Sequence, residues 1–221
     1  MQADTFLAPD FRTRRHRMVL EQLEARGISS VRVLEVMREV ERERFVSANL
    51  ADEAYDDRAL PSDLGQTISQ PFIVALMTEA LAIEPCNRVL EIGTGTGYQT
   101  AILAKLSRQV FTIERLEELS TTARQRLVAL GLQNVSFRVG DGTLGWPEAA
   151  PFDRILVTAA APQIVPTLLD QLANGGRMVL PVGEEPAQRL TLVERFRGKT
   201  IERPLVGVRF VRLIGAEGFA E

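Results

Sequence analysis

The chain has 221 residues, of which 45% are hydrophobic and 25% charged, with a formal net charge of −3 and an isoelectric point near 5.5. This is the composition of a globular protein, and its mild acidity argues against a dedicated nucleic-acid-binding protein, which is more often basic. The single cysteine, Cys86, excludes an internal disulfide and a cysteine-rich metal site, and the single histidine, His16, argues against a histidine-based catalytic triad.

The termini and the apolar runs bear on location. No apolar run approaches the length of a membrane span. The first residues also lack the basic segment followed by an apolar one that marks a secretory signal. We therefore expect a cytoplasmic protein with no membrane partner.

Residues 11–50 are expected to form helices. A first segment, rich in Arg and Glu, ends near Gly27, and Ser30 is a suitable N-cap for a second helix over 31–40. The basic cluster at 12–17 could suggest an RNA-binding patch. We interpret it as a solvated helix face, because acidic residues follow at once.

Residues 51–70 are expected to form a loop, because Pro and Gly interrupt a stretch of small hydrogen-bonding side chains. Pro71 is well placed to start an apolar helix over 72–81. Ser69 lies just before that helix. Its hydroxyl could cap the helix, or it could belong to a functional site, since irregular, uncharged loops often carry function.

The stretch RVLEIGTGTGYQ (88–99) reads as a buried strand, a turn with three alternating glycines, and the start of a helix. Glycine tolerates positive φ and lets the backbone approach a ligand closely. The third glycine comes one residue earlier than in a dinucleotide-binding turn. Glu91, inside the strand end, suits the cationic parts of a ligand. The alternative is a glycine-rich turn with a structural or nucleotide-binding role.

The remaining core alternates strands and helices. Strands are expected at 109–113, 135–139, 154–157 and 178–182, a helix at 116–130, and an antiparallel pair at 188–196 and 201–211. This pattern predicts an α/β fold with a doubly wound, Rossmann-like, mostly parallel sheet, an antiparallel C-terminal pair and additional N-terminal helices. We expect a single domain over 1–221, with a helical and loop cap at 11–83 and a ligand-binding core at 88–213.

The glycine turn resembles motif I of the class I methyltransferases, which use S-adenosylmethionine. The segment GQTISQP (65–71) makes the resemblance specific, because together the two motifs resemble the protein-L-isoaspartate O-methyltransferase family. Later segments that also resemble the family are GDGTLGWPE (140–148), PFDRILVTAAAP (151–162), NGGRMVLPVG (174–183) and VRFVRL (208–213). The resemblance spans roughly residues 18–213.

Departures from the family pattern are small. Glu41 stands where proline is common, Ser62 and Asp63 replace a more apolar pair, and Cys86-Asn87 replaces a glycine-containing turn. None of them removes a motif residue, so they leave the implied chemistry in place.

The resemblance implies methyl transfer from S-adenosylmethionine to the free carboxylate of L-isoaspartyl, and to a lesser extent D-aspartyl, residues in damaged proteins. The ester would collapse to a succinimide that partly reopens to normal aspartate. A carboxylate with a reference pKa of about 3.9 is already ionised, so no general base is needed. The protein has only to align and desolvate the reacting groups.

Each candidate site residue follows from a motif or a strand end. Ser69 resembles the active-site serine of the family and is interpreted as a hydrogen-bond positioner near the acceptor, not a nucleophile. Glu114 could hold the ribose hydroxyls and Asp141 the adenine amino group; the alternatives are a helix-starting carboxylate and a plain turn. The substrate-binding candidates are Ser69, Gln70, Thr158 and Ala159. The cofactor-binding candidates are Gln66, Thr67, Ile68, Glu91, Gly93, Thr94, Gly95, Gly97, Glu114, Arg115, Asp141 and Gly142.

Two alternative functions remain at this point. One is a class I methyltransferase acting on a small molecule or RNA, and the other is a non-catalytic nucleotide-binding relative. Ser69, Thr67 and the acidic charge disfavour the first, and the motif residues at every strand end disfavour the second. We expect isoaspartyl proteins and peptides as partners, with no nucleic acid and no metal, and a monomeric enzyme.

Overall fold

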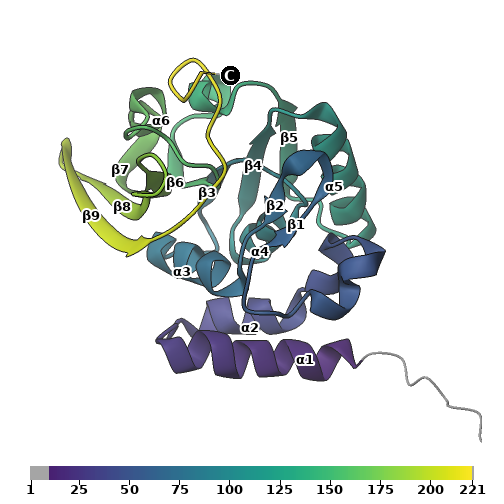
Figure 1. Cartoon of the computed structure of the whole chain (residues 1–221). Coiled ribbons are helices and arrows are strands. Elements are labelled where there is room, and N and C mark those ends of the chain that lie inside the picture. Colours follow the sequence, from purple (N-terminus) through teal and green to yellow (C-terminus); the bar gives the residue numbers. More distant parts are fainter. Residues whose placement is uncertain (1–9, 221) are drawn as a thin grey trace, which may run out of the picture.

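The computed structural model describes residues 10–220, and its centre is a seven-stranded sheet (Figure 1). The strands run in the order β5-β4-β3-β6-β7-β8-β9; the first five are parallel, and the last two are antiparallel. Their bounds are β3 Arg88–Ile92, β4 Gln109–Glu114, β5 Val135–Val139, β6 Phe152–Val157, β7 Leu172–Val182, β8 Arg189–Phe196 and β9 Lys199–Gly207. The predicted fold class is confirmed.

The strand order places a switch point beside β3. The chain runs outward from β3 through β4 to β5 and then returns to the opposite side of β3 as β6. At such a point the connections after neighbouring strands leave in opposite directions, which opens a crevice at the carboxyl ends of the strands. The crevice therefore lies beyond Ile92 and Val157.

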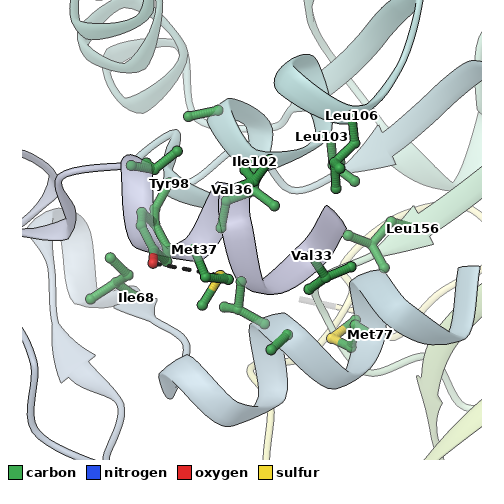
Figure 2. Close-up of a cluster of buried hydrophobic side chains, with 14 of the residues drawn as sticks. Val33, Val36, Met37, Ile68, Met77, Tyr98, Ile102, Leu103, Leu106 and Leu156 are labelled. Carbon is green, nitrogen blue, oxygen red and sulfur yellow. Dashed lines mark hydrogen bonds between the residues drawn. The ribbon is translucent and has the colours of Figure 1, made fainter. Parts of the chain in front are cut away.

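One face of the sheet is covered by two layers of helices. The first layer includes α3 (Pro71–Leu81) and α4 (Tyr98–Leu106), and α1 (Phe11–Arg17) and α2 (Val31–Glu39) lie below them in Figure 1. Figure 2 shows how apolar side chains of α2 pack against those of α3 and α4 and so join the two layers. The residues are Val33, Val36 and Met37 of α2, Met77 of α3, and Tyr98, Ile102, Leu103 and Leu106 of α4.

The opposite face has a thinner cover. It is formed by α6 (Pro166–Asp170) and by two short 3₁₀ segments, Gly142–Leu144 and Pro147–Ala149. Between those segments Trp146 packs edge-on against Phe111, with 5.4 Å between ring centroids. The remaining helix, α5 (Glu117–Ala129), contacts β4 and β5 and contributes Leu127 to the core of the first face. None of the helices within 10–220 is long and apolar enough to cross a bilayer.

The predicted signals at the helix ends are confirmed, but the first helix differs from the prediction. Ser30 accepts a hydrogen bond from the backbone N–H of Val33, and Gly27 ends the first segment in the left-handed region with φ of 94°. After Arg17 the first helix continues as a π-helical stretch, Met18–Leu23. The interpretation of 12–17 as a solvated face is wrong for Arg15, which is buried. Its burial is tolerated because the guanidinium donates a hydrogen bond to the carbonyl of Arg38 and lies 3.6 Å from the Glu43 carboxylate.

Three stretches differ from the expected elements. The predicted loop contains a small hairpin of β1 (Leu60–Pro61) and β2 (Thr67–Ile68), strand β7 begins at Leu172, and the short helix α6 was not predicted.

The predicted last strand, 201–211, is observed as β9, Lys199–Gly207. Further along the chain, the side chain of Gln188, and not a neighbouring strand, takes the backbone hydrogen bonds of Phe210. The buried Gln188 amide accepts a hydrogen bond from the Phe210 N–H at 2.6 Å and donates one to the Phe210 carbonyl at 3.1 Å. This exchange turns residues 208–219, here named the C-terminal strap, away from the sheet and across the crevice.

Candidate functional site

The main pocket lies at the carboxyl ends of β3, β4 and β6. Its floor is the glycine turn after β3, and the residues that follow β4 and β6 form two of its sides. Residues 66–69 close it from the N-terminal half of the chain, and residues 210–214 of the C-terminal strap close it from the other. The pocket therefore combines segments from both halves of the sequence.

The three glycines of the turn have different structural roles. An added Cβ at Gly95, where φ is 53°, would point into space that no atom of residues 10–220 approaches within 4 Å, and the Gly95 backbone lines the pocket. A Cβ at Gly93 would lie 2.2 Å from Thr158 Oγ1, and one at Gly97 would lie 3.3 Å from Ala123 of α5. Gly95 thus leaves room for a ligand, whereas Gly93 and Gly97 allow close packing within the protein.

Thr158 joins β6 to the glycine turn. Its hydroxyl lies 3.0 Å from the Ile92 carbonyl and 2.8 Å from the Gly93 carbonyl, and its N–H donates to the Ile92 carbonyl at 2.9 Å. Ala159 follows directly, and both residues line the pocket. The two predicted substrate residues after β6 are therefore held against the turn.

Glu114 connects the second strand end to the same turn. Its carboxylate accepts hydrogen bonds from the N–H of Gly95 at 2.9 Å and from the N–H of Leu116 at 3.1 Å. The residue is 8% exposed and lines the pocket, as does Arg115. Carboxylate oxygens can accept further bonds, so Glu114 has capacity for a ligand hydroxyl.

Glu91 lies behind the pocket rather than in its wall. The side chain is fully buried, and one carboxyl oxygen accepts hydrogen bonds at 2.6 Å from the hydroxyls of Thr100 and Thr112. Thr112 in turn lies 2.7 Å from the hydroxyl of Thr94, which does line the pocket. Glu91 therefore does not make the predicted direct contact in this geometry. It is linked to the pocket only through the hydroxyls of Thr112 and Thr94.

The burial of Glu91 has a consequence for stability. Desolvation raises the pKa of Glu91 to about 8 from its ordinary value of 4.5, although the hydrogen bonds from both threonines oppose the shift. In the folded protein Glu91 holds a proton that the unfolded chain releases, so low pH favours the folded state. The stabilisation from this bound proton is complete below pH 4.5 and is lost as pH rises through about 8.

We therefore expect Glu91→Gln, which cannot ionise, to gain stability relative to the wild type as pH rises from about 5 to about 9. Thermal unfolding of both proteins across that range measures the effect. The melting-temperature difference should move in favour of the variant as pH rises towards about 8 and level off above that value. A difference that stays constant would show that Glu91 is already ionised in the folded protein throughout the range.

Asp141 also lies outside the wall of the main pocket. Its carboxylate accepts hydrogen bonds from the N–H and hydroxyl of Thr143, at 2.8 and 2.7 Å, and from the N–H of Ala216 at 2.7 Å. Burial raises the pKa of Asp141, but these hydrogen bonds outweigh it and hold that pKa below its usual value. Asp141 thus ties the C-terminal strap to the sheet. Gly142 lines the pocket, and a Cβ there would lie 2.3 Å from Ile92.

Ser69 lies in the pocket and does not cap α3. The N-cap residue of that helix is Gln70, no side chain caps it, and Pro71 takes the first helical position as predicted. The capping interpretation of Ser69 is therefore wrong. Within residues 10–220 the Ser69 hydroxyl makes no hydrogen bond to the protein, which leaves it available to a ligand.

Gln70, a predicted substrate residue, points elsewhere. Its side-chain amide donates to the carbonyl of Asp57 at 3.0 Å and to the Asp57 carboxylate at 2.7 Å. Gln66, Thr67 and Ile68, in contrast, all line the pocket. The loop before α3 therefore supplies residues 66–69 to the pocket and uses Gln70 to anchor itself.

The sequence interpretation missed several pocket residues. Val74 and Met77 of α3 and the apolar residues Ile92, Ile113 and Leu116 near the strand ends are among them. The glycine turn and the start of α4 contribute residues 96, 98 and 99, for which the glycine motif was a usable signal. The strap contributes a further group, Phe210, Val211, Arg212, Leu213 and Ile214. Phe210 and Val211 fall within the predicted strand 201–211, and the alternation of polar and apolar residues does not indicate that the chain leaves the sheet before them.

The pocket fits S-adenosylmethionine. The open space above Gly95, the adjoining Glu114 carboxylate and the free Ser69 hydroxyl are suited to a ligand with hydroxyl groups and a positively charged centre. A doubly wound sheet that places a glycine turn of this spacing and an acidic second strand end around one crevice defines a class I methyltransferase.

The family follows from comparison of the whole chain. The sequence profile of the protein-L-isoaspartate(D-aspartate) O-methyltransferase family matches residues 14–218. The chain belongs to this family.

Similar proteins agree along nearly the full length. The chain is 53% identical over 210 residues to protein-L-isoaspartate O-methyltransferase 1 of Syntrophobacter fumaroxidans, covering 95% of this chain and 98% of the relative. It is 49% identical over 221 residues to protein-L-isoaspartate O-methyltransferase of Dictyoglomus turgidum, covering 100% of both. The solved structure of a Plasmodium falciparum β-aspartate methyltransferase in complex with S-adenosyl-L-homocysteine matches with a TM-score of 0.80 and 27% identity, over 90% of this chain and 98% of the other.

Proposed function

We propose that the chain methylates the free carboxylate of L-isoaspartyl residues, and to a lesser extent D-aspartyl residues, in damaged proteins and peptides, with S-adenosylmethionine as the methyl donor. The family and the pocket both support this activity. The observation that carries it is the Ser69 hydroxyl, which lies in the pocket with no bond to the described protein, opposite a glycine turn that leaves space for a ligand.

The cofactor residues hold one side of the reaction. When bound, S-adenosylmethionine supplies an electrophilic methyl group on a sulfonium centre. Gly95 and Thr94 offer backbone contacts, and Glu114 is the residue that we propose for the ribose hydroxyls. Glu91 supports the turn through Thr112 and does not contact the ligand in our proposal.

The acceptor residues hold the other side. Ser69 donates a hydrogen bond to the acceptor carboxylate, and Thr158 and Ala159 shape the pocket beside it. The substrate carboxylate is ionised at neutral pH, so the protein needs no base to activate it. The arrangement agrees with this, because His16 is exposed on α1 and does not line the pocket. Orientation and exclusion of water are then the main contributions of the protein.

The remaining features of the enzyme stay proposals. We propose that the N-terminal helices and the core act as a single domain, since α2 contacts both α3 and α4. We also propose that the enzyme is a monomer in the cytoplasm. We propose in addition that it has no nucleic-acid partner, which the net charge of −3 supports.

The function is tested with matched peptides that differ only in isoaspartate or aspartate at one position. We expect methylation of the isoaspartyl peptide to exceed that of the aspartyl peptide by on the order of 100-fold, because a misplacement of about 1 Å can cost that much in rate. Ser69→Ala should lower turnover about 10- to 100-fold, the effect of losing one hydrogen bond to a charged group, and should leave cofactor affinity unchanged.

The control is Ser29→Ala, which removes a hydroxyl outside the pocket lining and should retain wild-type turnover. Equal rates on the two peptides would contradict the isoaspartyl assignment and favour a small-molecule or RNA acceptor. No methylation of either peptide by cofactor-loaded enzyme would have the same meaning.

A further inference from the structure

Arg212 of the C-terminal strap lines the main pocket beside the acceptor residues. Its backbone is fixed there. The N–H of Ala160 donates to the Val211 carbonyl, and the N–H of Leu213 donates to the Ala160 carbonyl, both at 2.8 Å. These bonds form a parallel bridge between Ala160 and Arg212, so the arginine is held next to the end of β6.

Among the residues that the structure describes, no neighbour neutralises the charge of Arg212. Within residues 10–220 no carboxylate lies within 4.0 Å of its guanidinium, which lies over the ring of Phe219, 5.2 Å from the ring centroid. Arg209, three residues earlier, is by contrast paired with Glu185 at 3.1 Å. An exposed guanidinium that stacks on a ring and keeps its hydrogen-bond donors free can bind a carboxylate.

The loop on the opposite side of the acceptor region, residues 66–70, carries no cation of its own. No lysine or arginine occurs between Arg58 and Arg88, so residues 66–70 carry no positive charge. The pocket-lining Arg115 follows Glu114, at the end assigned to the cofactor. Arg212 is therefore placed to act on the peptide rather than on the cofactor. Its exposure puts it at the mouth of the pocket, where residues next to the acceptor would pass.

We propose that Arg212 is a specificity-determining residue that attracts an acidic side chain flanking the isoaspartyl acceptor. This inference rests on the proposed function, and it adds a preference for the charge of the surrounding sequence. At low salt the attraction extends over tens of ångströms, and at physiological salt it is confined to about 8 Å.

The test uses isoaspartyl peptides that carry Glu, Gln or Lys on either side of the acceptor. For the wild type at low salt we expect KM to rise in the order Glu, Gln, Lys, with about a threefold to tenfold span from the first to the last. Maximal turnover should differ little among the peptides. Affinity for labelled peptides, measured by fluorescence anisotropy without turnover, should follow the same order.

Four variants separate recognition from structural support. Arg212→Gln should reduce the span to within about twofold, Arg212→Glu should reverse the order, and Arg212→Lys should retain it. Arg209→Gln, the matched control from the same segment, should behave as the wild type. Cofactor affinity should be unchanged in all four. A purely structural role, in which Arg212 only stacks on Phe219, would not alter the preference for peptide charge.

Two results would overturn the proposal in distinguishable ways. If the wild type methylates all the isoaspartyl peptides without regard to charge, or if Arg212→Gln keeps the wild-type order, Arg212 does not determine specificity. If the wild type methylates none of them, the proposed function itself fails, and this role fails with it.

Discussion

Gly95→Val is expected to abolish binding of S-adenosylmethionine to a protein that remains folded. The residue has a φ of 53°, and a Cβ there meets no atom of the described chain within 4 Å, so a valine side chain would occupy the space that we assign to the ligand. Loss of close backbone approach at such a position leaves the ligand no alternative pose in the turn. We expect the affinity measured by calorimetry to fall by at least about 100-fold.

The control for backbone strain is Gly131→Val. Gly131 also has a positive φ, 74°, and no atom within 4 Å of an added Cβ, but it lies after α5 and does not line the pocket. It should lose stability without losing cofactor affinity. Wild-type affinity in folded Gly95→Val would mean that the turn has only a structural role.

Much of the sheet could be predicted because its strands are buried on both faces. Runs such as 89–92 and 154–157 contain little but apolar residues, and the glycine turn that begins at Gly93 ends the first of them clearly. The parallel arrangement followed from the alternation with helices, and the position of the crevice followed from the parallel arrangement. Placing Glu114 and Thr158 at the same edge therefore required no knowledge of their contacts.

The outcome for Glu91 shows what strand position alone could not predict. Successive side chains of a strand point to opposite faces, so a residue near the carboxyl end can face the helices rather than the crevice. Glu91 shares its face with Val89, which packs in the helix-covered core, and it therefore meets Thr100 of α4. The motif suggested that Glu91 contacts a ligand. The alternation along the strand instead places its side chain on the helix-covered face, behind the pocket.

The C-terminal strap was missed for a different reason. Residues 201–211 have the composition of a strand, and the interruption at Gly207 depends on Gln188, a residue distant in sequence whose side chain bonds both backbone groups of Phe210. Asp141 is similarly affected, since its carboxylate bonds Ala216 of the same strap. Contacts between segments this far apart leave no local pattern from which they could be predicted.

Glu114→Ala is expected to weaken the binding of S-adenosylmethionine by roughly 100- to 10,000-fold. Two hydrogen bonds between a charged group and ribose hydroxyls, at about 1.5–3 kcal/mol each, set this range. The structure adds a second contribution, because the alanine would also release the N–H of Gly95 and the N–H of Leu116 from the carboxylate. The variant should therefore be slightly less stable than the wild type while remaining folded.

The two contributions can be separated with a cofactor analogue that lacks one ribose hydroxyl. If Glu114 holds that hydroxyl, the analogue should bind the wild type more weakly than S-adenosylmethionine does, and the two ligands should bind Glu114→Ala almost equally. The losses are then non-additive, as for groups in direct contact. If Glu114 only positions the turn, the losses from the variant and from the analogue should add. An affinity of Glu114→Ala for S-adenosylmethionine within about threefold of wild type would exclude both roles, because even one hydrogen bond to a charged group contributes more than that.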